Sequence, residues 1–347
     1  MKRVAILCGG PGSEHEISCL SAAGVLSAIN RSEYEPVLIG ITREGQWLLL
    51  PLDYSLSIEN DQLPSVRGDF PQVIRSKDGF VVADTNLAID VIFPVLHGTY
   101  GEDGQLQSDL DQIGIPYVGS GAVASEQAMD KSEAKALFSA AGLAIAPGIT
   151  VTEFEWKNNP AVITELIAPL GLPLFVKASR GGSSRGTVKV KDHSHFAAAM
   201  EEALSFDSKV LIESAIDGAE VECAVLDVDG DIQASIPGKV WIDSRFEFYD
   251  FQAKYLDGAT RIDIPAPFGA SIIEKIRELA LVAFKAMGAS GLARVDFFVT
   301  QSGEIIINEI NTMPGFTRTS AYPKMWQATG IGYTELITHL LQSALRR

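Results

Sequence analysis

Two runs with the composition of β-strands near the C-terminus, residues 293–297 and 307–311, constrain the fold of this chain most strongly. They flank Thr300–Glu304, whose polar, glycine-containing sequence is typical of a hairpin turn. Phenylalanine, valine and isoleucine in and beside both runs indicate strands that are largely buried. We therefore expect an antiparallel hairpin inside a sheet, in which every carboxylate needs a partner or a metal ion.

The polar residues of this hairpin predict a metal site. Side chains alternate faces along a strand, so Arg294 and Asp296 share one face, and Glu309 and Asn311 also share one. If the strands pair across the turn, two carboxylates and one amide oxygen converge beside a guanidinium. Such hard oxygen donors suit Mg²⁺, which binds nucleotide phosphates through one or two carboxylates. The alternative is a surface hairpin with scattered charges, which the apolar neighbours disfavour.

Composition excludes several classes of function. With 347 residues, the chain is long enough for two or three domains. Its formal net charge of −16 argues against broad contact with nucleic acid or an anionic membrane, because both need a basic face. No segment is expected to cross a bilayer, and the apolar run that ends at Cys8 is too short for a secretion signal. Three widely spaced cysteines predict buried thiols in a reducing cytosol.

The order of the expected elements predicts three regions. Strands and helices alternate over residues 1–123, which indicates a parallel α/β domain. Shorter units over 124–211 predict a small α+β domain, and 212–347 combine antiparallel strands with helices. Residues 53–79 are expected to be irregular. Helices are expected at 18–29, 105–113, 125–142, 196–204, 270–287 and 332–345.

The first expected strand ends in a glycine-rich loop, Gly9–Glu16. Its first two glycines suit a dinucleotide-binding turn, but His15 stands where the third glycine of that pattern belongs. Two acids, Glu14 and Glu16, take the place of the pyrophosphate. They would either attract an ammonium group or only favour the helix N-terminus through its dipole, and the loop alone leaves both interpretations open.

A second loop, Lys177–Gly186, is predicted to bind phosphate. Its small residues let backbone N–H groups and hydroxyls approach phosphate oxygens, and Lys177 adds a positive charge. The loop lacks the Gly-Lys-Ser/Thr of a Walker sequence, and a surface hairpin is the alternative. Further on, Glu213 and Glu220 could hold an adenine amino group and ribose hydroxyls, although a solvated strand end explains these acids equally well.

Three other features suit a reactive site. The aromatic run Phe248–Tyr255 predicts a lid at about 242–260, since lids exclude water from reactive intermediates, although core packing is the usual role of aromatic residues. Gly315 could present its backbone N–H to an oxyanion beside Arg294. His97 ends an apolar strand, where α/β sheets commonly bind ligands, and we expect it to lie in the site without transferring a proton.

Taken together, these segments resemble the D-alanine–D-alanine ligases of the ATP-grasp superfamily. The resemblance covers nearly the whole chain, and its joint motifs are highly specific although no single one is. They are Gly9–Gly10 with Ser13–Ser18, Leu96–Gly98 with Gly101–Gly104, Met129–Lys131, Gly182–Ser184, Ala253–Tyr255, Ala293–Asp296, Asn308–Asn311 and Met313–Thr317. The resemblance implies a three-domain ATP-grasp fold in which an N-terminal parallel-sheet domain precedes two domains that hold ATP.

The resemblance also implies a role for each candidate residue. Residues that would bind ATP are Lys131, Lys177, Ser184, Glu213, Ile216, Glu220, Phe248, Lys254 and Asn308. Two Mg²⁺ ions, which Mn²⁺ could replace, would be held by Asp296, Glu309 and Asn311. The implied catalytic residues are Glu14, Ser183, Tyr255, Arg294 and Gly315, and the implied substrate-binding residues are His97 and Ser320.

The implied reaction joins two D-alanines for bacterial peptidoglycan synthesis. Attack of the first carboxylate on the γ-phosphate of ATP would give a D-alanyl phosphate and ADP, and the amine of the second D-alanine would then displace phosphate. By this resemblance, the tyrosine directly after Lys254, Tyr255, favours an amine as the nucleophile. A D-alanyl-D-lactate or D-alanyl-D-serine ligase is the alternative. The intact metal ligands disfavour a non-catalytic ATP-binding protein, and His15 disfavours a nicotinamide-dependent oxidoreductase. A homodimer in the cytoplasm is also implied.

Overall fold

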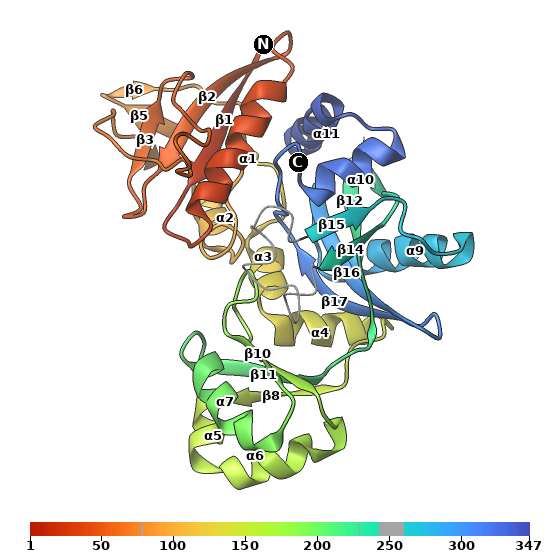
Figure 1. The fold of residues 1–347 in the computed structure, drawn as a ribbon. Coiled ribbons are helices and arrows are strands. Elements are labelled where there is room, and N and C mark those ends of the chain that lie inside the picture. Colours follow the sequence, from red (N-terminus) through yellow and green to blue (C-terminus); the bar gives the residue numbers. More distant parts are fainter. Residues whose placement is uncertain (78, 229, 243–259) are drawn as a thin grey trace.

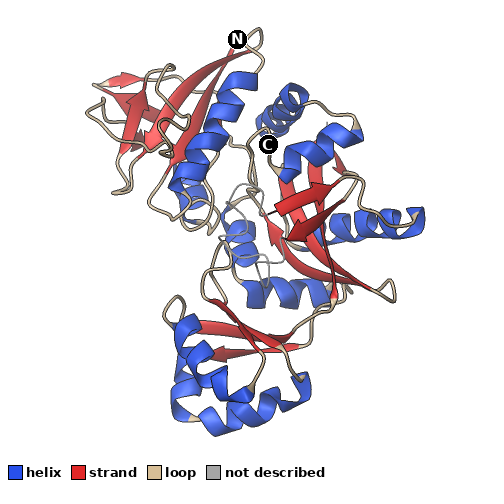
Figure 2. Cartoon of the chain, viewed as in Figure 1, coloured by secondary structure: helices blue, strands red, loops and turns tan. Residues whose placement is uncertain are grey.

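The computed structural model describes residues 1–77, 79–228, 230–242 and 260–347. They form three larger β-sheets that follow one another along the chain, each with helices packed against it (Figure 1). Figure 2 shows that strands and helices are mixed in all three parts, so the predicted combination of α/β and α+β architecture is confirmed. Residues Phe248–Tyr255 of the predicted lid lie outside the described residues.

The first sheet has the strand order β3-β2-β1-β7. Strand β1 pairs in parallel with β2 and β7, whereas β3 adds an antiparallel edge, so the sheet is mostly parallel, as predicted. A small antiparallel sheet, β4-β5-β6, begins inside residues 53–79, so the expectation of an irregular segment is wrong at its C-terminal end. The elements of this part are β1 (Lys2–Gly9), α1 (His15–Ala28), β2 (Tyr34–Ile41), β3 (Trp47–Leu50), β4 (Ile74–Ser76), β5 (Gly79–Val82), β6 (Thr85–Asn86), β7 (Val91–Pro94) and α2 (Gln105–Ile113).

Alternate residues of β1 are buried on both faces of this sheet. Val4 and Ile6 belong to a core that also contains residues of α1 and of two C-terminal helices, α10 (Ala321–Thr329) and α11 (Tyr333–Arg346). Leu7 belongs to the core on the opposite face, which α2 covers. A parallel sheet buried on both faces needs the continuous apolar run that the sequence has here.

The second sheet is fully antiparallel, with the order β10-β9-β11-β8. Its helices lie together on one side of the sheet, where their apolar residues form a separate core (Figure 1). The elements are β8 (Gly148–Thr152), α5 (Glu153–Asn158), α6 (Pro160–Ile167), β9 (Leu174–Ala178), β10 (Thr187–Val190), α7 (Phe196–Leu204) and β11 (Lys209–Ser214). Its position places the loop between β9 and β10 at the centre of the molecule.

Most of residues 125–142 are helical, as expected, but a break that was not predicted divides them between two helices, α3 (Ala122–Met129) and α4 (Lys131–Ala140). Asp130 separates them because its backbone is extended, and its side chain accepts hydrogen bonds from the backbone N–H groups of Ser132 and Glu133. An aspartate at the N-cap satisfies donors that a helix terminus leaves free. The break places Lys131 in the first turn of α4.

The third sheet has the order β15-β14-β12-β16-β17, and β13 pairs with β12. Along β16, Val295 and Phe297 face a core covered by α9, whereas Arg294 and Asp296 lie on the opposite face and line a cleft. The elements are β12 (Gly218–Val228), β13 (Asp231–Ala234), β14 (Gly238–Ile242), β15 (Thr260–Asp263), α9 (Ala270–Ala286), β16 (Leu292–Thr300) and β17 (Ile305–Asn311).

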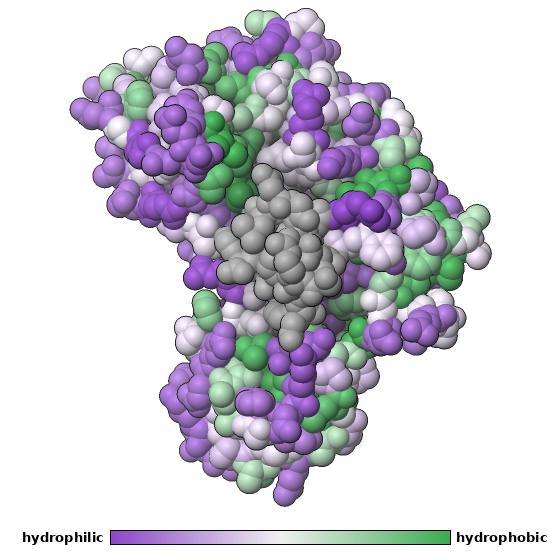
Figure 3. Space-filling view, viewed as in Figure 1, coloured by the Kyte–Doolittle hydropathy of each residue, from purple (hydrophilic) through white to green (hydrophobic). Residues whose placement is uncertain are grey.

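The bounds of the three predicted domains remain a prediction, although each contains one larger sheet. Strand β11 continues past residue 211 to Ser214. Helix α4 and most of α3 fall within predicted domain 124–211, yet they contribute Ala128 and Phe138 to the core of the third sheet. Hydrophilic residues predominate over the N-terminal part on the face seen in Figure 3. Within the described residues, none of the helices has the length and apolar character needed to span a bilayer.

Candidate active site

One cleft of about 670 Å³ is lined by every predicted site residue that the structure describes. These are Glu14, His97, Lys131, Lys177, Ser183, Ser184, Glu213, Ile216, Glu220, Arg294, Asp296, Asn308, Glu309, Asn311, Gly315 and Ser320. They come from loops and strand ends of all three parts of the chain, which meet there. Phe248, Lys254 and Tyr255 lie outside the described residues.

The predicted hairpin of β16 and β17 forms one wall of the cleft. Arg294 pairs in register with Asn311, and Asp296 pairs with Glu309, as the alternation of faces predicts. The register then shifts, because Phe297 pairs with Ile307 and the intervening Asn308 is extra on β17. Such a bulge re-aims side chains, and it lets Asn308 and Glu309 line the same cleft although they are sequence neighbours.

Arg294 is held in this wall by carboxylates. Its Nε and one terminal nitrogen donate to the two oxygens of Asp296 at 2.8 and 2.6 Å, and Asn311 Nδ2 donates to Asp296 at 3.1 Å. Glu222, which the sequence analysis missed, lies opposite Asp296 on β12 and brings Oε1 to 3.4 Å from Arg294 Nε. Its spacing of two residues from Glu220 is the signal that could have revealed it, because both share one face of a strand.

The donors in the hairpin fit Mg²⁺. Asp296, Glu309 and Asn311 offer carboxylate and amide oxygens, the hard ligands that this ion prefers. Among the residues described here, no group of three or more His, Cys, Asp or Glu side chains could hold a metal ion alone. The ions would therefore take their remaining ligands from the amide, water and phosphate oxygens, which is usual for Mg²⁺ beside a nucleotide.

A loop with strained backbone faces the same cleft. Ser183 and Ser184 adopt positive φ angles of 49° and 59°, a conformation that costs free energy for residues other than glycine. Lys131 Nζ donates to the carbonyl of Gly181 at 2.5 Å, and Ser183 donates to a carboxylate oxygen of Glu14. The loop is thus connected both to α4 and to the first loop of the chain. Strain at such a turn is typical of sites that present backbone N–H groups to anions.

A buried charge cluster lies beside this loop. Glu213 forms ion pairs with Lys177 and with Lys135, whose Nζ lies 2.9 Å from its Oε2. Burial alone would raise the pKa of Glu213, but the two lysines outweigh burial and hold the pKa at about 2. Lys135 was missed by the sequence analysis. It lies four residues after Lys131, on the same side of a helix, and this spacing could have revealed it.

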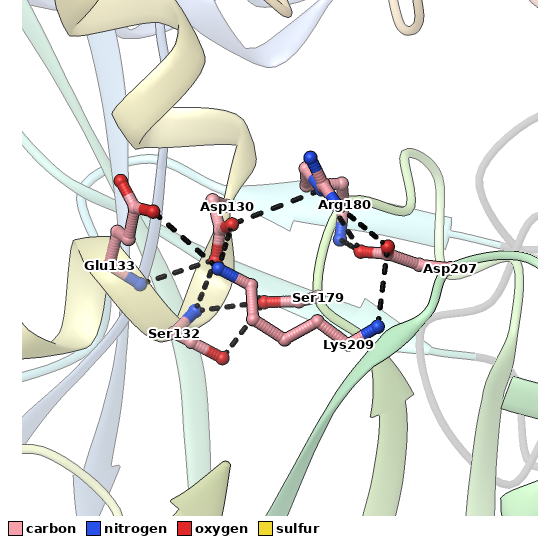
Figure 4. A network of polar contacts seen from close by, with 7 residues as sticks. All are labelled: Asp130, Ser132, Glu133, Ser179, Arg180, Asp207 and Lys209. Carbon is pink, nitrogen blue, oxygen red and sulfur yellow. Dashed lines mark hydrogen bonds and ion pairs between the residues drawn. The ribbon is translucent and has the colours of Figure 1, made fainter. Parts of the chain in front are cut away.

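Figure 4 shows a polar network that connects α4 to the loop between β9 and β10. Asp130 accepts a hydrogen bond from Ser179 Oγ at 2.7 Å and forms an ion pair with Lys209. Arg180 donates to both carboxylate oxygens of Asp207, at 3.2 and 3.0 Å. Backbone atoms add a further bond, from the N–H of Lys131 to the carbonyl of Ser179 at 2.9 Å. These contacts fix Lys131 relative to the loop.

Another part of the cleft is built by the loop after β17. Gly315 lies close to Ser320, since a Cβ added to this glycine would be 3.2 Å from Ser320 Oγ. Glu102 accepts hydrogen bonds from the backbone N–H groups of Gly98, at 2.6 Å, and Met313, at 3.3 Å. Burial, together with the charge of Glu14, raises the pKa of Glu102 to about 8. This part of the cleft therefore joins the first and third parts of the chain.

The fold and this cleft define an ATP-grasp enzyme, because a strained, serine-rich loop on one sheet faces paired acids on the next. A sequence model described as D-ala D-ala ligase N-terminus matches residues 3–120, and one described as D-ala D-ala ligase C-terminus matches residues 137–342. The chain belongs to the D-alanine–D-alanine ligase family.

Similar proteins extend over the full length of the chain. The D-alanine–D-alanine ligase of Paenarthrobacter aurescens is 45% identical, covering 99% of this chain and 95% of its own length. That of Arthrobacter sp. is 46% identical, covering 99% and 94%. Among solved structures, the VanG D-Ala:D-Ser ligase from Enterococcus faecalis superposes with a TM-score of 0.87 at 35% identity, covering 99% of each chain. The D-alanine–D-alanine ligase from Coxiella burnetii gives 0.84 at 32% identity, covering 100% of this chain and 96% of its own.

Proposed function

We propose that this chain is an ATP-dependent D-alanine–D-alanine ligase, which forms D-alanyl-D-alanine for peptidoglycan synthesis and releases ADP and phosphate. The observation that carries this conclusion is its family membership together with the complete set of described candidate residues in one cleft. The formation of D-alanyl-D-serine is a second candidate, because the VanG D-Ala:D-Ser ligase has a similar structure along the whole chain.

Binding of ATP is assigned to the cleft between the second and third sheets. We propose that Lys131, Lys177 and Ser184 contact phosphates, that Glu213 and Ile216 contact adenine, and that Glu220 contacts ribose. Further contacts are assigned to Asn308 and to the undescribed Phe248 and Lys254. Asp296, Glu309 and Asn311 would hold Mg²⁺, which when bound neutralises charge on the phosphates.

Activation of the first D-alanine begins with its orientation. Glu14 would bind its ammonium group, and the hydrogen bond from Ser183 keeps that carboxylate beside the phosphate-binding loop. The substrate carboxylate then attacks the γ-phosphorus of ATP. An O–P bond forms, the bond to the β-phosphate oxygen breaks, and D-alanyl phosphate and ADP result. Tyr255, in the undescribed lid, would complete the group that excludes water from this reactive anhydride.

Peptide bond formation needs stabilisation of a developing oxyanion. Ser320 would bind the carboxylate of the second D-alanine, and His97 would line its site. The neutral amine attacks the carbonyl carbon of D-alanyl phosphate and a C–N bond forms; the C–O bond to phosphate then breaks, and the departing phosphate takes up the proton that the amine loses. We assign the guanidinium of Arg294 and the backbone N–H of Gly315 to the oxyanion, because such donors act most strongly where water is excluded.

We also propose a homodimer in the cytoplasm, with three domains over residues 1–123, 124–211 and 212–347. The three cysteines are free and buried, which suits a reducing compartment. Light scattering in dilute solution would test the dimer, and a monomer at all concentrations would contradict it.

The reaction is tested by measuring phosphate release from Mg-ATP, with products identified by mass spectrometry. D-Alanine alone, D-alanine with D-serine, D-alanine with D-lactate, and L-alanine are compared. We expect release with D-alanine alone and formation of the D-alanyl-D-alanine dipeptide. Release only when D-serine or D-lactate is added would assign the second substrate differently, and no release with any of them would reject the ligase.

A further inference from the structure

Two side chains of the N-terminal part, Ser21 and His97, hold the turn at residues 313–316. Ser21 has no role in the reaction steps proposed above. Ser21, on α1, is fully buried, and its hydroxyl lies 2.8 Å from His97 Nε2. The opposite ring nitrogen, His97 Nδ1, lies 2.9 Å from the carbonyl oxygen of Met313. The backbone N–H of Phe316 donates to Ser21 Oγ at 3.4 Å. Ser21 and His97 thus contact both ends of this turn.

These contacts fix the direction of every hydrogen bond. A carbonyl oxygen can only accept, so His97 Nδ1 carries the proton that it shares with Met313. Burial lowers the pKa of His97, although Glu14 partly opposes this effect, so the imidazole is neutral and Nε2 is an acceptor. The Ser21 hydroxyl must therefore donate to Nε2, and its oxygen is left to accept from Phe316. The order of donors is Phe316 to Ser21, Ser21 to His97, and His97 to Met313.

The same turn is held by other contacts outside this series. Glu102 accepts from the N–H of Met313 at 3.3 Å, and Tyr333 donates its hydroxyl to the carbonyl of Phe316 at 2.5 Å. The backbone N–H and C=O of Met313 and of Phe316 are therefore all hydrogen-bonded, and both residues are buried. Gly315 lies between them. Its N–H lies in the rigid peptide plane that joins Pro314 to Gly315, so the direction of this N–H depends on how the chain is held on either side, at Met313 and at Phe316.

We propose that Ser21 is a positioning residue, which orients the backbone N–H of Gly315 through His97, Met313 and Phe316. This inference rests on the proposed function, in which Gly315 binds the oxyanion. Ser21 does not touch substrate in this role. Its removal would leave His97 Nε2 without its donor and Phe316 N–H without its acceptor, and the turn would lose its fixed orientation. Small displacements of an oxyanion donor reduce the rate strongly, since such donors act over a narrow range of distance.

The structure offers a matched control on the same helix. Ser18 is also fully buried on α1, and its hydroxyl makes two hydrogen bonds, from the N–H of Gly9 at 2.9 Å and to the carbonyl of Val95 at 2.5 Å. Neither bond reaches residues 313–316. Ser18→Ala therefore removes a buried hydroxyl of the same kind and nearly the same surroundings, without releasing the turn.

The experiment compares Ser21→Ala, Ser18→Ala and the unaltered enzyme for dipeptide formation from D-alanine and Mg-ATP. We expect Ser21→Ala to lower kcat by about tenfold to a hundredfold and to leave the KM for ATP within about twofold, because the turn acts after ATP has bound. Ser18→Ala is expected to keep kcat within about threefold of the unaltered enzyme, although both variants lose a buried hydrogen bond and some stability.

A partial reaction separates the two chemical steps. Positional isotope exchange in ATP, measured with D-alanine present, reports formation of D-alanyl phosphate and should continue in Ser21→Ala. If that variant does not fold, Ser21→Cys, which keeps a weak donor, takes its place in the same comparison. Equal kcat values for the Ser21 and Ser18 variants, or a slowed isotope exchange, would overturn the positioning role. An unaltered enzyme that forms no dipeptide would instead reject the proposed function, and the inference with it.

Discussion

At the scale of single residues, the charges around Arg294 hold its guanidinium in one wall of the cleft. Its guanidinium faces Asp296 and Glu222 together, and its side chain is 14% exposed. The guanidinium stays between these two carboxylates, because moving it away would leave buried carboxylates unpaired, at a cost of several kcal/mol of free energy. Arg294 is therefore held where an oxyanion could be stabilised, rather than free to turn toward solvent.

We predict that Arg294→Ala reduces kcat/KM for dipeptide formation more than a hundredfold, or by about 3 kcal/mol of transition-state stabilisation. Arg277→Ala is the control, since Arg277 lies on α9 and bonds to Glu274 and to the carbonyl of Ala234. Steady-state kinetics with both variants test the assignment. A near-normal rate for Arg294→Ala would remove this residue from the proposed mechanism.

The buried carboxylate of Glu213 predicts a dependence of stability on pH. Its pKa falls from an ordinary 4.5 to about 2, so the ionised form is favoured by folding. The resulting stability, roughly 3 kcal/mol, is complete above pH 4.5 and is lost as the pH falls through 2. We expect the Glu213→Gln variant to lose this dependence of the free energy of unfolding on pH, as measured by urea denaturation across the same pH range.

Glu278→Gln serves as the control for this titration, because Glu278 is exposed on α9 and pairs only with the neighbouring Lys275 among the contacts described. This variant should follow the unaltered protein between pH 4.5 and 2. If Glu213→Gln follows it too, then the ion pairs with Lys177 and Lys135 do not perturb this carboxyl as inferred.

At the scale of elements, the break between α3 and α4 connects helix capping to the loop between β9 and β10, which lines the cleft. We predict that Asp130→Ala destabilises the protein by about 1–2 kcal/mol, because α4 loses its cap and Ser179 and Lys209 lose a partner. The KM for ATP should rise as well, since the network in Figure 4 fixes the position of Lys131.

A second capped helix provides the comparison. Thr152 caps α5 by a reciprocal pair of bonds with Glu155, on the surface of the second part of the chain. Thr152→Ala should cost about 1 kcal/mol in thermal or urea unfolding while leaving the KM for ATP unchanged. A similar KM in the Asp130 and Thr152 variants would show that the cap contributes only to stability.

The elements also show how far the sequence could predict the structure. The hairpin of β16 and β17 was predictable because strand alternation alone brings Arg294 and Asp296 to one face, and the turn residues lie between two runs with the composition of β-strands. The break at Asp130 was missed, although an aspartate followed three residues later by Glu133 is a recognised signal for the start of a helix. The extra residue at Asn308 has no sequence signal, since a bulge depends on how two strands pair.

At the scale of the whole molecule, the site depends on which loops meet, and sequence spacing does not determine this. The contact between Ser21 and Phe316 joins residues far apart in the chain, and it exists because α1 packs in one core with α10 and α11. Family resemblance could identify Glu14 and Gly315 as candidates. It did not reveal the side chains that support them, such as Glu222, because their roles appear only when the sheets are assembled.

A cleft lined by all three parts of the chain predicts that its ligand stabilises the whole molecule. We expect Mg-ATP to raise the midpoint of thermal unfolding, because a ligand at a hundred times its Kd adds about 2.7 kcal/mol to the folded state. ATP with EDTA should give a smaller rise, and NAD none. Glu309→Gln should remove the difference that Mg²⁺ makes, whereas Glu304→Gln, an exposed acid in the turn of the same hairpin, should preserve it. If Mg²⁺ stabilises both variants equally, the proposed metal ligands at this hairpin are wrong.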